Sequence, residues 1–508
     1  MRGALIVCGT GSDVGKSHVV TGLCRVLARQ GVAVAPFKAQ NMALNSFVTP
    51  GGGEIGRAQA VQALAARVEP EVAMNPVLLK PTGERASQVV VMGRPVAHLD
   101  AAAYQQAKAD LLPTVLGALA DLRRRFDVVL IEGAGSPTEI NLADGDIVNL
   151  RLAALAGTVP AVVVGDIDRG GVFAALYGTV ALLSDELRPL VRGFVINKLR
   201  GDPALLGCGP TDLERRCGVP TLGVLPYVHD VALDAEDSLA LDGRRPTAAS
   251  PPAGEGLDVA AVRFPRLSNF TDLDALAVEP GVSVRLVDHA AALGDPDLVI
   301  LPGTKATVAD LEWLRGRGLD RAVAAAITRG SVVVGICGGC QMMGRTIVDD
   351  VESGRGAVPG LGWLPVDTVF RREKVTRQRR GRALGHRVSG YQIHHGQVSA
   401  GRGARTWLRL DDAYGTGDDG VTTDGASPDG DGGAVLGTTL HGLFDEDGFR
   451  TGFLADVGRR RGRAFVPAGV RFAAARQAQI DRLADLLEAH LDLAAVEALI
   501  KEGEGSHQ

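Results

Sequence analysis

Residues 4–17 read ALIVCGTGSDVGKS, which is a short apolar run, a glycine-rich loop and then Gly15-Lys16-Ser17. This order is typical of a strand, a loop and the start of a helix, where successive backbone N–H groups can hold phosphate oxygens. A lysine in such a loop can reach the β- and γ-phosphates, and the hydroxyl after it can bind Mg²⁺. The stretch therefore predicts a nucleotide site with Ser17 as a metal ligand and with contacts from Thr10, Gly11, Asp13, Gly15, Lys16 and Ser17.

More apolar runs follow along the chain, and alanine- and leucine-rich stretches of helical character separate them. The runs lie at 32–37, 88–93, 127–133, 161–166, 193–198 and 221–226. Runs that are apolar throughout fit strands covered on both faces, which predicts a parallel sheet with helices on each side. The fold class is therefore α/β.

The segment GDIDRGGVFA, residues 165–174, follows one of these predicted strands. Ligands of parallel α/β sheets bind beyond the carboxyl ends of the strands. We therefore expect Asp166, Asp168 and Arg169 at the ligand edge, where carboxylates could hold a metal and a guanidinium could pair with phosphate or a carboxylate substrate. A local ion pair that caps the next helix is the alternative.

A second domain is predicted after residues 241–256, which are rich in Pro, Ala, Gly and Ser and show no periodicity. A new series of strands and helices starts directly afterwards. We expect a first domain over 1–240, a linker over 241–256, a second α/β domain over 257–460, and a helical tail over 461–508 that packs on the protein.

Composition narrows the class of protein. The 508 residues are 46% hydrophobic and 22% charged, and the formal net charge is −5, so no basic excess points to nucleic acid as a partner. The six cysteines lack paired metal-ligand spacing, which favours a reducing compartment. We find no signal peptide and no apolar stretch of about 20 residues, and we expect a cytoplasmic protein without a membrane span. The oligomeric state is not predicted.

Residues 335–339, Gly-Ile-Cys-Gly-Gly, lie between an apolar run and an apparent helix. This is a nucleophile-elbow pattern with Cys337 at its apex, and the helix N-terminus favours the reactive thiolate. The N–H of Gly338 can serve as one oxyanion donor, and Gly303 in LPGTK can supply another. A redox pair with Cys340 and a buried inert thiol are the alternatives.

A nucleophilic thiol needs a base. His441, in LHGLFDEDGFR, ends another apolar run about 100 residues later, and such partners can be adjacent in the fold though distant in sequence. His394 and His395, in GYQIHHG, form a competing pair that we expect in a pocket wall or at a domain surface.

Together these motifs resemble the cobyric acid synthase family, the glutamine-dependent amidotransferases of cobalamin synthesis. The resemblance rests on GTGSDVGKS, FKAQNMALNS, IEGAGSPTEINL, GDIDRGGVFA, RFPRLSNFTDLDAL, LPGTK, GICGGCQMMG, GYQIHHG and LHGLFDEDGFR. It implies a P-loop synthetase domain followed by a class I glutamine amidotransferase domain. The implied activity is amidation, with ATP and glutamine, of the b, d, e and g carboxylates of adenosylcobyrinic acid a,c-diamide.

The resemblance also implies roles for individual residues. Lys38 would face the nucleotide or the substrate, and Glu132 and Glu54 are candidate Mg²⁺ ligands beside Ser17. Five residues are candidate substrate contacts: Gln40, Asn41, Asp166, Asp168 and Arg169. Cys337 and His441 would be the glutaminase pair. Many class I glutaminases carry Glu two residues after the catalytic His, but this chain has Leu443, which leaves the third residue unassigned.

Two other functions remain open from the sequence. A cobyrinic acid a,c-diamide synthase would use the same chemistry and domain order. A P-loop regulatory ATPase with an inert glutaminase-like domain is the alternative of another class. Both amidotransferase functions would require ATP, Mg²⁺ and glutamine. Their partners would be small molecules that include a corrinoid, and no tightly bound organic cofactor is expected.

Overall fold

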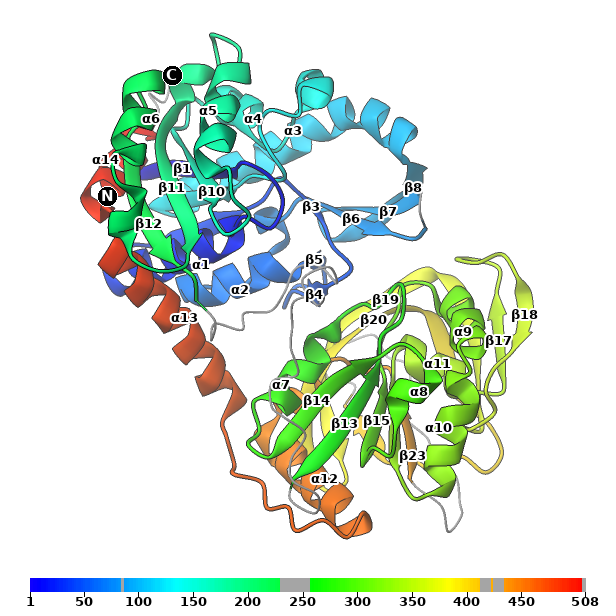
Figure 1. Cartoon of the computed structure of the whole chain (residues 1–508). Coiled ribbons are helices and arrows are strands. Elements are labelled where there is room, and N and C mark those ends of the chain that lie inside the picture. Colours follow the sequence, from blue (N-terminus) through cyan, green and yellow to red (C-terminus); the bar gives the residue numbers. More distant parts are fainter. Residues whose placement is uncertain (84–85, 229–255, 412–421, 424–433, 505–508) are drawn as a thin grey trace.

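The computed structural model describes residues 1–83, 86–228, 256–411, 422–423 and 434–504, which form two α/β domains (Figure 1). Of the expected linker, residues 241–255 lie outside the described residues. The predicted fold class is confirmed, because each domain is built on a parallel sheet with helices on its faces.

The first domain contains a six-stranded parallel sheet of order β12-β11-β10-β1-β9-β2. Its strands in chain order are β1 (Gly3–Gly9), β2 (Val34–Phe37), β9 (Val128–Glu132), β10 (Ala161–Asp166), β11 (Val191–Leu199) and β12 (Thr221–Pro226). Each face carries its own apolar core. Residues such as Ile6 pack under α3 (Ala101–Arg125), α4 (Leu150–Leu155), α5 (Val172–Leu182) and α6 (Gly209–Cys217), whereas Leu5 packs under α1 (Lys16–Arg29) and α2 (Arg57–Ala66).

One predicted strand lies outside this sheet. The run at 88–93 forms part of β7 (Ala86–Val91), which belongs to a small sheet with β3 (Gln40–Met42), β6 (Val77–Pro81) and β8 (Arg94–Asp100). Met92 and Gly93 have φ values of 46° and 78°, which gives the tight turn that folds β8 back antiparallel on β7. The expectation that this run joins the parallel sheet is therefore wrong.

The second domain contains a parallel sheet of order β14-β13-β15-β16-β23. Its strands are β13 (Leu257–Val262), β14 (Val282–Val287), β15 (Leu298–Leu301), β16 (Val332–Ile336) and β23 (Val435–Thr438). The helices of this domain are α7 (Asp274–Ala277), α8 (Ala290–Leu293), α9 (Thr307–Gly316), α10 (Leu319–Thr328), α11 (Gly338–Met343) and α12 (Asp447–Arg460). Across the described part of the chain, we find no helix with the length and apolar character needed to cross a bilayer.

A second sheet of this domain reaches the first domain. It has the order β18-β17-β19-β21-β22, with β20 paired to β19. Its strands are β17 (Thr346–Asp349), β18 (Gly356–Pro359), β19 (Val366–Ala383), β20 (His386–Ala400), β21 (Leu408–Leu410) and β22 (Thr422–Thr423). The long β19–β20 hairpin meets a short first-domain hairpin made of β4 (Ser46–Val48) and β5 (Glu54–Gly56) (Figure 1).

The interface between the two hairpins is mainly polar and buried. Glu54, fully buried on β5, accepts from Lys80 Nζ of its own domain at 2.5 Å and from Lys374 Nζ of β19 at 2.6 Å. Lys374 lies where the β19–β20 register shifts, between Phe370 and Val375. The lysine charges hold the pKa of Glu54 well below its usual range, although burial acts to raise it.

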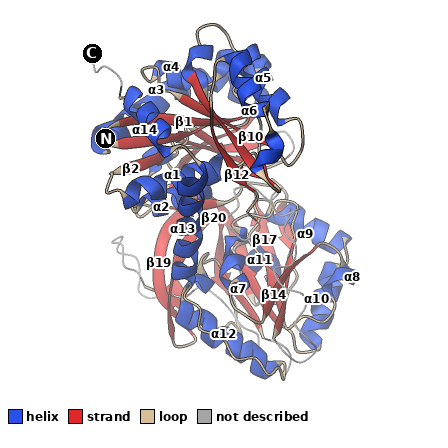
Figure 2. Cartoon of the chain, turned by 60° about the vertical axis from the view of Figure 1, so that its left-hand side comes forward, coloured by secondary structure: helices blue, strands red, loops and turns tan. Residues whose placement is uncertain are grey.

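The C-terminal helices return to the first domain. After α12, helix α13 (Phe472–His490) runs back alongside α1, and α14 (Leu493–Glu502) follows it (Figure 2). Arg29 of α1 pairs with Asp481, Asp485 and Glu488 of α13. Ile480, Leu487 and other apolar residues of these helices belong to the same core as α1 and α2. The tail is thus part of the first domain's packing.

This packing predicts the cost of weakening the tail. Leu487 is 1% exposed and lies against Gly22 of α1. Leu487→Ala should lower the free energy of unfolding by about 2–5 kcal/mol, as expected for a buried leucine that leaves a cavity. The measurement is the midpoint temperature of the first unfolding transition seen on heating in differential scanning calorimetry. Leu205→Ala is the matched control, because Leu205 is 80% exposed. An unchanged midpoint for Leu487→Ala would contradict the role of the tail.

Candidate active sites

The glycine-rich loop lies between β1 and α1 at the carboxyl edge of the first sheet. Gly15, immediately before α1, has a φ of 102°, a conformation that favours glycine. Lys16 Nζ donates to the carbonyl of Gly11 at 2.7 Å and to that of Gly135 at 3.1 Å. The lysine therefore lies across the loop, next to the segment that follows β9, where it can reach a bound phosphate group.

Glu132 ends β9 directly beside this loop and is fully buried. Its Oε1 accepts from Ser17 Oγ at 2.9 Å and from Lys38 Nζ at 2.9 Å, and its Oε2 accepts from Gln62 at 2.5 Å. Burial alone would raise the pKa of Glu132, but the charge and hydrogen bond of Lys38, together with the hydrogen bonds from Gln62 and Ser17, outweigh burial and lower the pKa below its usual value. An ionised carboxylate thus lies next to a serine hydroxyl, and Mg²⁺ prefers such oxygen ligands.

Glu54 lies apart from this pair. Both of its carboxylate oxygens are engaged by Lys80 and Lys374 at the domain interface. The structure brings together Ser17, Lys38 and Glu132 but does not bring Glu54 to them. A Mg²⁺ site assembled from protein groups at the loop would therefore use Ser17 and Glu132, with phosphate oxygens and water completing the coordination.

The predicted substrate contacts fall in two places. Gln40 and Asn41 lie on β3, where Gln40 accepts from the hydroxyl of Tyr104 at 2.6 Å and Asn41 donates to Gln59 at 2.9 Å. The segment after β10 lies beside the nucleotide loop instead. There Arg169 donates to the carboxylate of Asp13 at 3.1 Å.

Asp166, the last residue of β10, and Asp168, just after it, both contact basic side chains that the sequence analysis did not predict. Lys198 Nζ donates to Asp166 Oδ2 at 2.9 Å and to the carbonyl of Asp13 at 2.5 Å. Arg200 pairs with Asp168. Lys198 has a φ of 64° at the end of a strand, but the sequence signal was only a lysine that closes the run GFVINK.

In the second domain, the predicted elbow residues gather at one point. Strand β16 ends at Ile336 and helix α11 begins at Gly338, so Cys337 stands alone between them with a φ of 51°. A Cβ on Gly338 would lie 3.0 Å from the backbone nitrogen of Thr304, and one on Gly303 would lie 2.9 Å from Cε1 of His441. The segment 303–304 therefore lies against both His441 and the residue after Cys337, and His441 itself contacts Cys337.

The third residue of this site is Asp272. Its Oδ2 lies 2.7 Å from Nδ1 of His441, and its Oδ1 accepts from the N–H of Gly442 at 2.7 Å. Burial acts to lower the pKa of His441, but the charge and hydrogen bond of Asp272, together with those of Cys337, outweigh burial and raise this pKa to about 10. Asp272 thus fixes the imidazole with Nδ1 protonated and directs Nε2 toward the thiol.

Sequence reasoning did not assign Asp272. It lies in RLSNFTDLD, part of a segment on which the family resemblance rests, but the resemblance assigns no role to this carboxylate. Asp272 and His441 are 169 positions apart, so no local spacing joins them.

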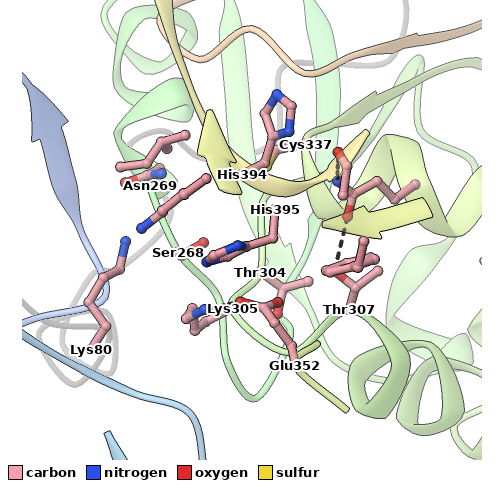
Figure 3. Close-up of a pocket in the computed structure, with 15 residues that line it drawn as sticks. Lys80, Ser268, Asn269, Thr304, Lys305, Thr307, Cys337, Glu352, His394 and His395 are labelled. Atoms are coloured by element: carbon pink, nitrogen blue, oxygen red, sulfur yellow. Dashed lines mark hydrogen bonds and ion pairs between the residues drawn. The ribbon is translucent and has the colours of Figure 1, made fainter. Parts of the chain in front are cut away.

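His394 and His395 line the pocket that contains Cys337 (Figure 3). Burial lowers the pKa of His394 to about 4, so this imidazole is neutral near pH 7. Nε2 of His395 lies 3.2 Å from the side-chain nitrogen of Gln88 in the first domain. Lys80 of the first domain and the Lys305–Glu352 ion pair line the same pocket, which therefore lies between the domains (Figure 3).

The two domains match two family models. Residues 5–240 match a CobQ/CobB/MinD/ParA nucleotide binding domain, and residues 258–449 match a CobB/CobQ-like glutamine amidotransferase domain. With the loop and the cysteine site described above, the chain is a ligase that joins a nucleotide-binding domain to a glutamine amidotransferase domain.

Relatives that match along nearly their whole length identify the family within this class of ligases. A cobyric acid synthase of Rhodococcus jostii is 53% identical over 99% of this chain and 96% of the relative, and one of Streptomyces avermitilis is 53% identical over 99% and 97%. A third, from Streptomyces coelicolor, is 52% identical over 99% and 97%. The chain belongs to the cobyric acid synthase family.

The contact of Asp272 with His441 can be tested by a single substitution. Asp272→Asn removes the charge that favours protonated His441 and can reverse the tautomer, because an amide can donate to Nδ1. Glutamine hydrolysis should fall by about 10²- to 10⁴-fold in kcat, the usual contribution of a positioned acid or base. Amidation supported by added ammonia should persist, which also shows that the variant is folded. Unchanged hydrolysis would exclude Asp272 from the site.

Proposed function

We propose that this enzyme amidates the b, d, e and g carboxylates of adenosylcobyrinic acid a,c-diamide with ATP and glutamine, giving adenosylcobyric acid. One observation carries the proposal: Cys337, whose partner His441 is held by Asp272, lines a pocket together with Lys80 of the first domain, and in that domain the buried Glu132 lies against Ser17 of the nucleotide loop. The names of the full-length relatives support the product, and the geometry supports the chemistry.

The glutaminase steps follow from the second domain. The thiolate of Cys337 attacks the carboxamide carbon of glutamine, and N–H donors at Gly303 and Gly338 stabilise the oxyanion. His441 gives its Nε2 proton to the departing ammonia while Asp272 keeps the imidazole in place. Water, activated by the now neutral His441, then hydrolyses the glutamyl thioester, which releases glutamate and restores the thiol.

The synthetase steps belong to the first domain. Lys16 and the loop N–H groups hold the phosphates of ATP, and the γ-phosphoryl group passes to a substrate carboxylate to form an acyl phosphate. Ser17 and Glu132 would hold Mg²⁺, which supplies charge neutralisation on the phosphates. Lys38, once released from Glu132, can pair with the developing charge. Ammonia then attacks the acyl carbon, phosphate leaves, and the amide remains.

Ammonia explains why one chain carries both domains. Free ammonia is mostly protonated at neutral pH, and ammonium has no lone pair with which to attack. Ammonia released at Cys337 inside a pocket lined also by Lys80 of the first domain can reach the acyl phosphate without equilibrating with bulk water.

The proposal is tested by incubating the full chain with ATP, Mg²⁺, glutamine and adenosylcobyrinic acid a,c-diamide, and counting the amides added by mass spectrometry. Four amides are expected. In a parallel incubation with cobyrinic acid as the acceptor, amidation at the a and c positions would instead identify a cobyrinic acid a,c-diamide synthase. Nucleotide hydrolysis without glutamine hydrolysis or amidation would favour a regulatory ATPase.

Two substitutions should separate the two half-reactions. Cys337→Ala should abolish amidation with glutamine but preserve amidation with high ammonia, whereas Cys340→Ala, three residues away, is the control and should retain glutamine use.

Lys16→Ala should suppress amidation with either nitrogen donor by about 10- to 100-fold, because a charge-assisted phosphate contact contributes about 1.5–3 kcal/mol. Amidation rates with the two donors are the measurement. Ammonia-dependent turnover at the wild-type rate in Lys16→Ala would exclude Lys16 from the nucleotide site.

A further inference from the structure

The backbone of one first-domain residue is bound on both sides, through its N–H and its carbonyl, by two side chains of the second domain. Ser46 is the first residue of β4, and its N–H donates to Oδ1 of Asn269 at 2.9 Å. Its carbonyl accepts from the hydroxyl of Tyr391 at 3.2 Å. Ser46 and Asn269 are buried to within 2% of full burial, and Tyr391 is 4% exposed.

The same two side chains flank the catalytic imidazole. Nδ2 of Asn269 lies 3.3 Å from Nε2 of His441. The ring of Tyr391 stacks on His441 with centroids 5.3 Å apart and an interplanar angle of 22°. The backbones of Tyr391 and His441 also exchange two hydrogen bonds, of 3.0 and 2.9 Å. The position of Ser46 therefore bears directly on both neighbours of the histidine.

The orientation of the Asn269 amide follows from these contacts. Because Ser46 can only donate through its N–H, Oδ1 of Asn269 faces Ser46 and the amide NH₂ faces His441. Asp272 keeps a proton on Nδ1, so the amide NH₂ can donate to Nε2 only while the imidazole is neutral, and it therefore opposes the protonated form that Asp272 and Cys337 favour. Cys337 interacts with this same imidazole, whose Nε2 must exchange a proton with the thiol. The amide thus competes with the thiol for Nε2.

Asn269 is held in a conformation that needs support. Its φ is 51°, in the left-handed region that few residues other than glycine adopt. Next to it, the N–H of Phe270 donates to Oδ1 of Asn45 in the first domain at 3.2 Å. Strained residues of this kind persist where their surroundings hold them.

Ser46 is connected to the nucleotide site by a short stretch of chain. It lies eight residues after Lys38, which pairs with Glu132 beside the loop. The side chain of Ser46 also accepts from Lys80 at 3.0 Å. A shift of Lys38 when Mg²⁺ and nucleotide engage Glu132 would therefore be passed along residues 38–46 to Ser46.

We propose that Asn269 and Tyr391 are positioning residues through which the first domain restrains glutamine hydrolysis until that domain is loaded. In the restrained state, Ser46 fixes the Asn269 amide so that it occupies Nε2 of His441. When Ser46 shifts, the amide can rotate about χ2 and accept from Nε2–H, which supports the thiolate–imidazolium pair. This inference rests on the proposed function, because it assumes that the first domain's ligands stimulate the glutaminase.

The test measures glutamine hydrolysis by the full chain, first without and then with ATP, Mg²⁺ and the a,c-diamide. Asn269→Gly removes the amide and suits the positive φ. It should raise the basal kcat by about 3- to 10-fold, as expected for one lost hydrogen bond, and reduce the stimulation factor to the same extent. Tyr391→Phe keeps the stacked ring, loses only the hydroxyl, and should change both quantities in the same directions by less.

The matched control is Gln378→Ala. Gln378 makes another hydrogen bond across the domains, to the carbonyl of Val48 in the same β4 strand. The basal rate and stimulation factor of this variant should equal those of the wild type. Equal increases in Gln378→Ala and Asn269→Gly would mean that any loosening of the interface has the effect, and would overturn the specific role of Asn269.

Two other outcomes would also overturn the proposal. A basal kcat that falls or stays constant in both Asn269→Gly and Tyr391→Phe, with an unchanged stimulation factor, overturns the proposal. A raised KM for glutamine with unchanged kcat shows that Asn269 binds glutamine instead, which also overturns it. Ammonia-dependent amidation reports folding, and the conservative Tyr391→Phe carries the test should Asn269→Gly fail to fold. The basal rate needs no acceptor, so failure of the proposed function, seen as absent amidation by the wild type, is distinguishable.

Discussion

The buried carboxylate of Glu54 is held between Lys80 of its own domain and Lys374 of the other domain. Removing one partner of a buried ion pair costs about 3–5 kcal/mol, because it leaves an uncompensated charge. Lys374 can supply its charge only if β19 lies against β5, so the relative position of the domains is constrained by this carboxylate. Burial lowers the pKa of Lys374 to about 8 against the pull of Glu54, which shows how much the pairing must offset. The placement of β4, and with it the contacts of Ser46 around His441, depends on this arrangement.

The features that the sequence predicted well are those encoded by contiguous residues. The nucleotide loop and the cysteine elbow each consist of a strand, a turn and the start of a helix that follow one another directly in the chain, so local pattern was enough to expect them. Runs of apolar residues gave the α/β class for the same reason. The run at 88–93 was assigned to the wrong sheet because strand propensity does not specify a pairing partner, and the turn at Met92-Gly93 decided it.

The features that the sequence did not predict depend on residues far apart in the chain. Asp272 meets His441 across 169 positions, and this contact exists only once β13, β16 and β23 have assembled. Glu54 was a plausible metal ligand from its motif, yet its partners are Lys80, in the neighbouring sheet, and Lys374, in the other domain. The sequence predicted a helical tail that packs on the protein, but it did not predict docking of this tail on α1. Carboxylates in particular are ambiguous in sequence, since a metal and a lysine are equally good partners for them.

The polar character of the interface suits an enzyme that must keep two reactions in step. Among the described residues, the apolar cluster shared by β4 and β20 is small, with Val48, Tyr391 and Ile393 as its buried members. Apolar contact is non-directional and tolerates small shifts. A hydrogen bond weakens steeply when its angle or length changes, so the contacts of Ser46 with Asn269 and Tyr391 can respond to small movements of the first domain. Buried charges at Glu54 keep the domains together, while directional contacts at Ser46 lie against the catalytic histidine. In the β4–β5 hairpin, Glu54 therefore holds the domains together, and Ser46 makes the hydrogen bonds that change with small movements. This division allows the glutaminase to respond to the synthetase without separation of the domains.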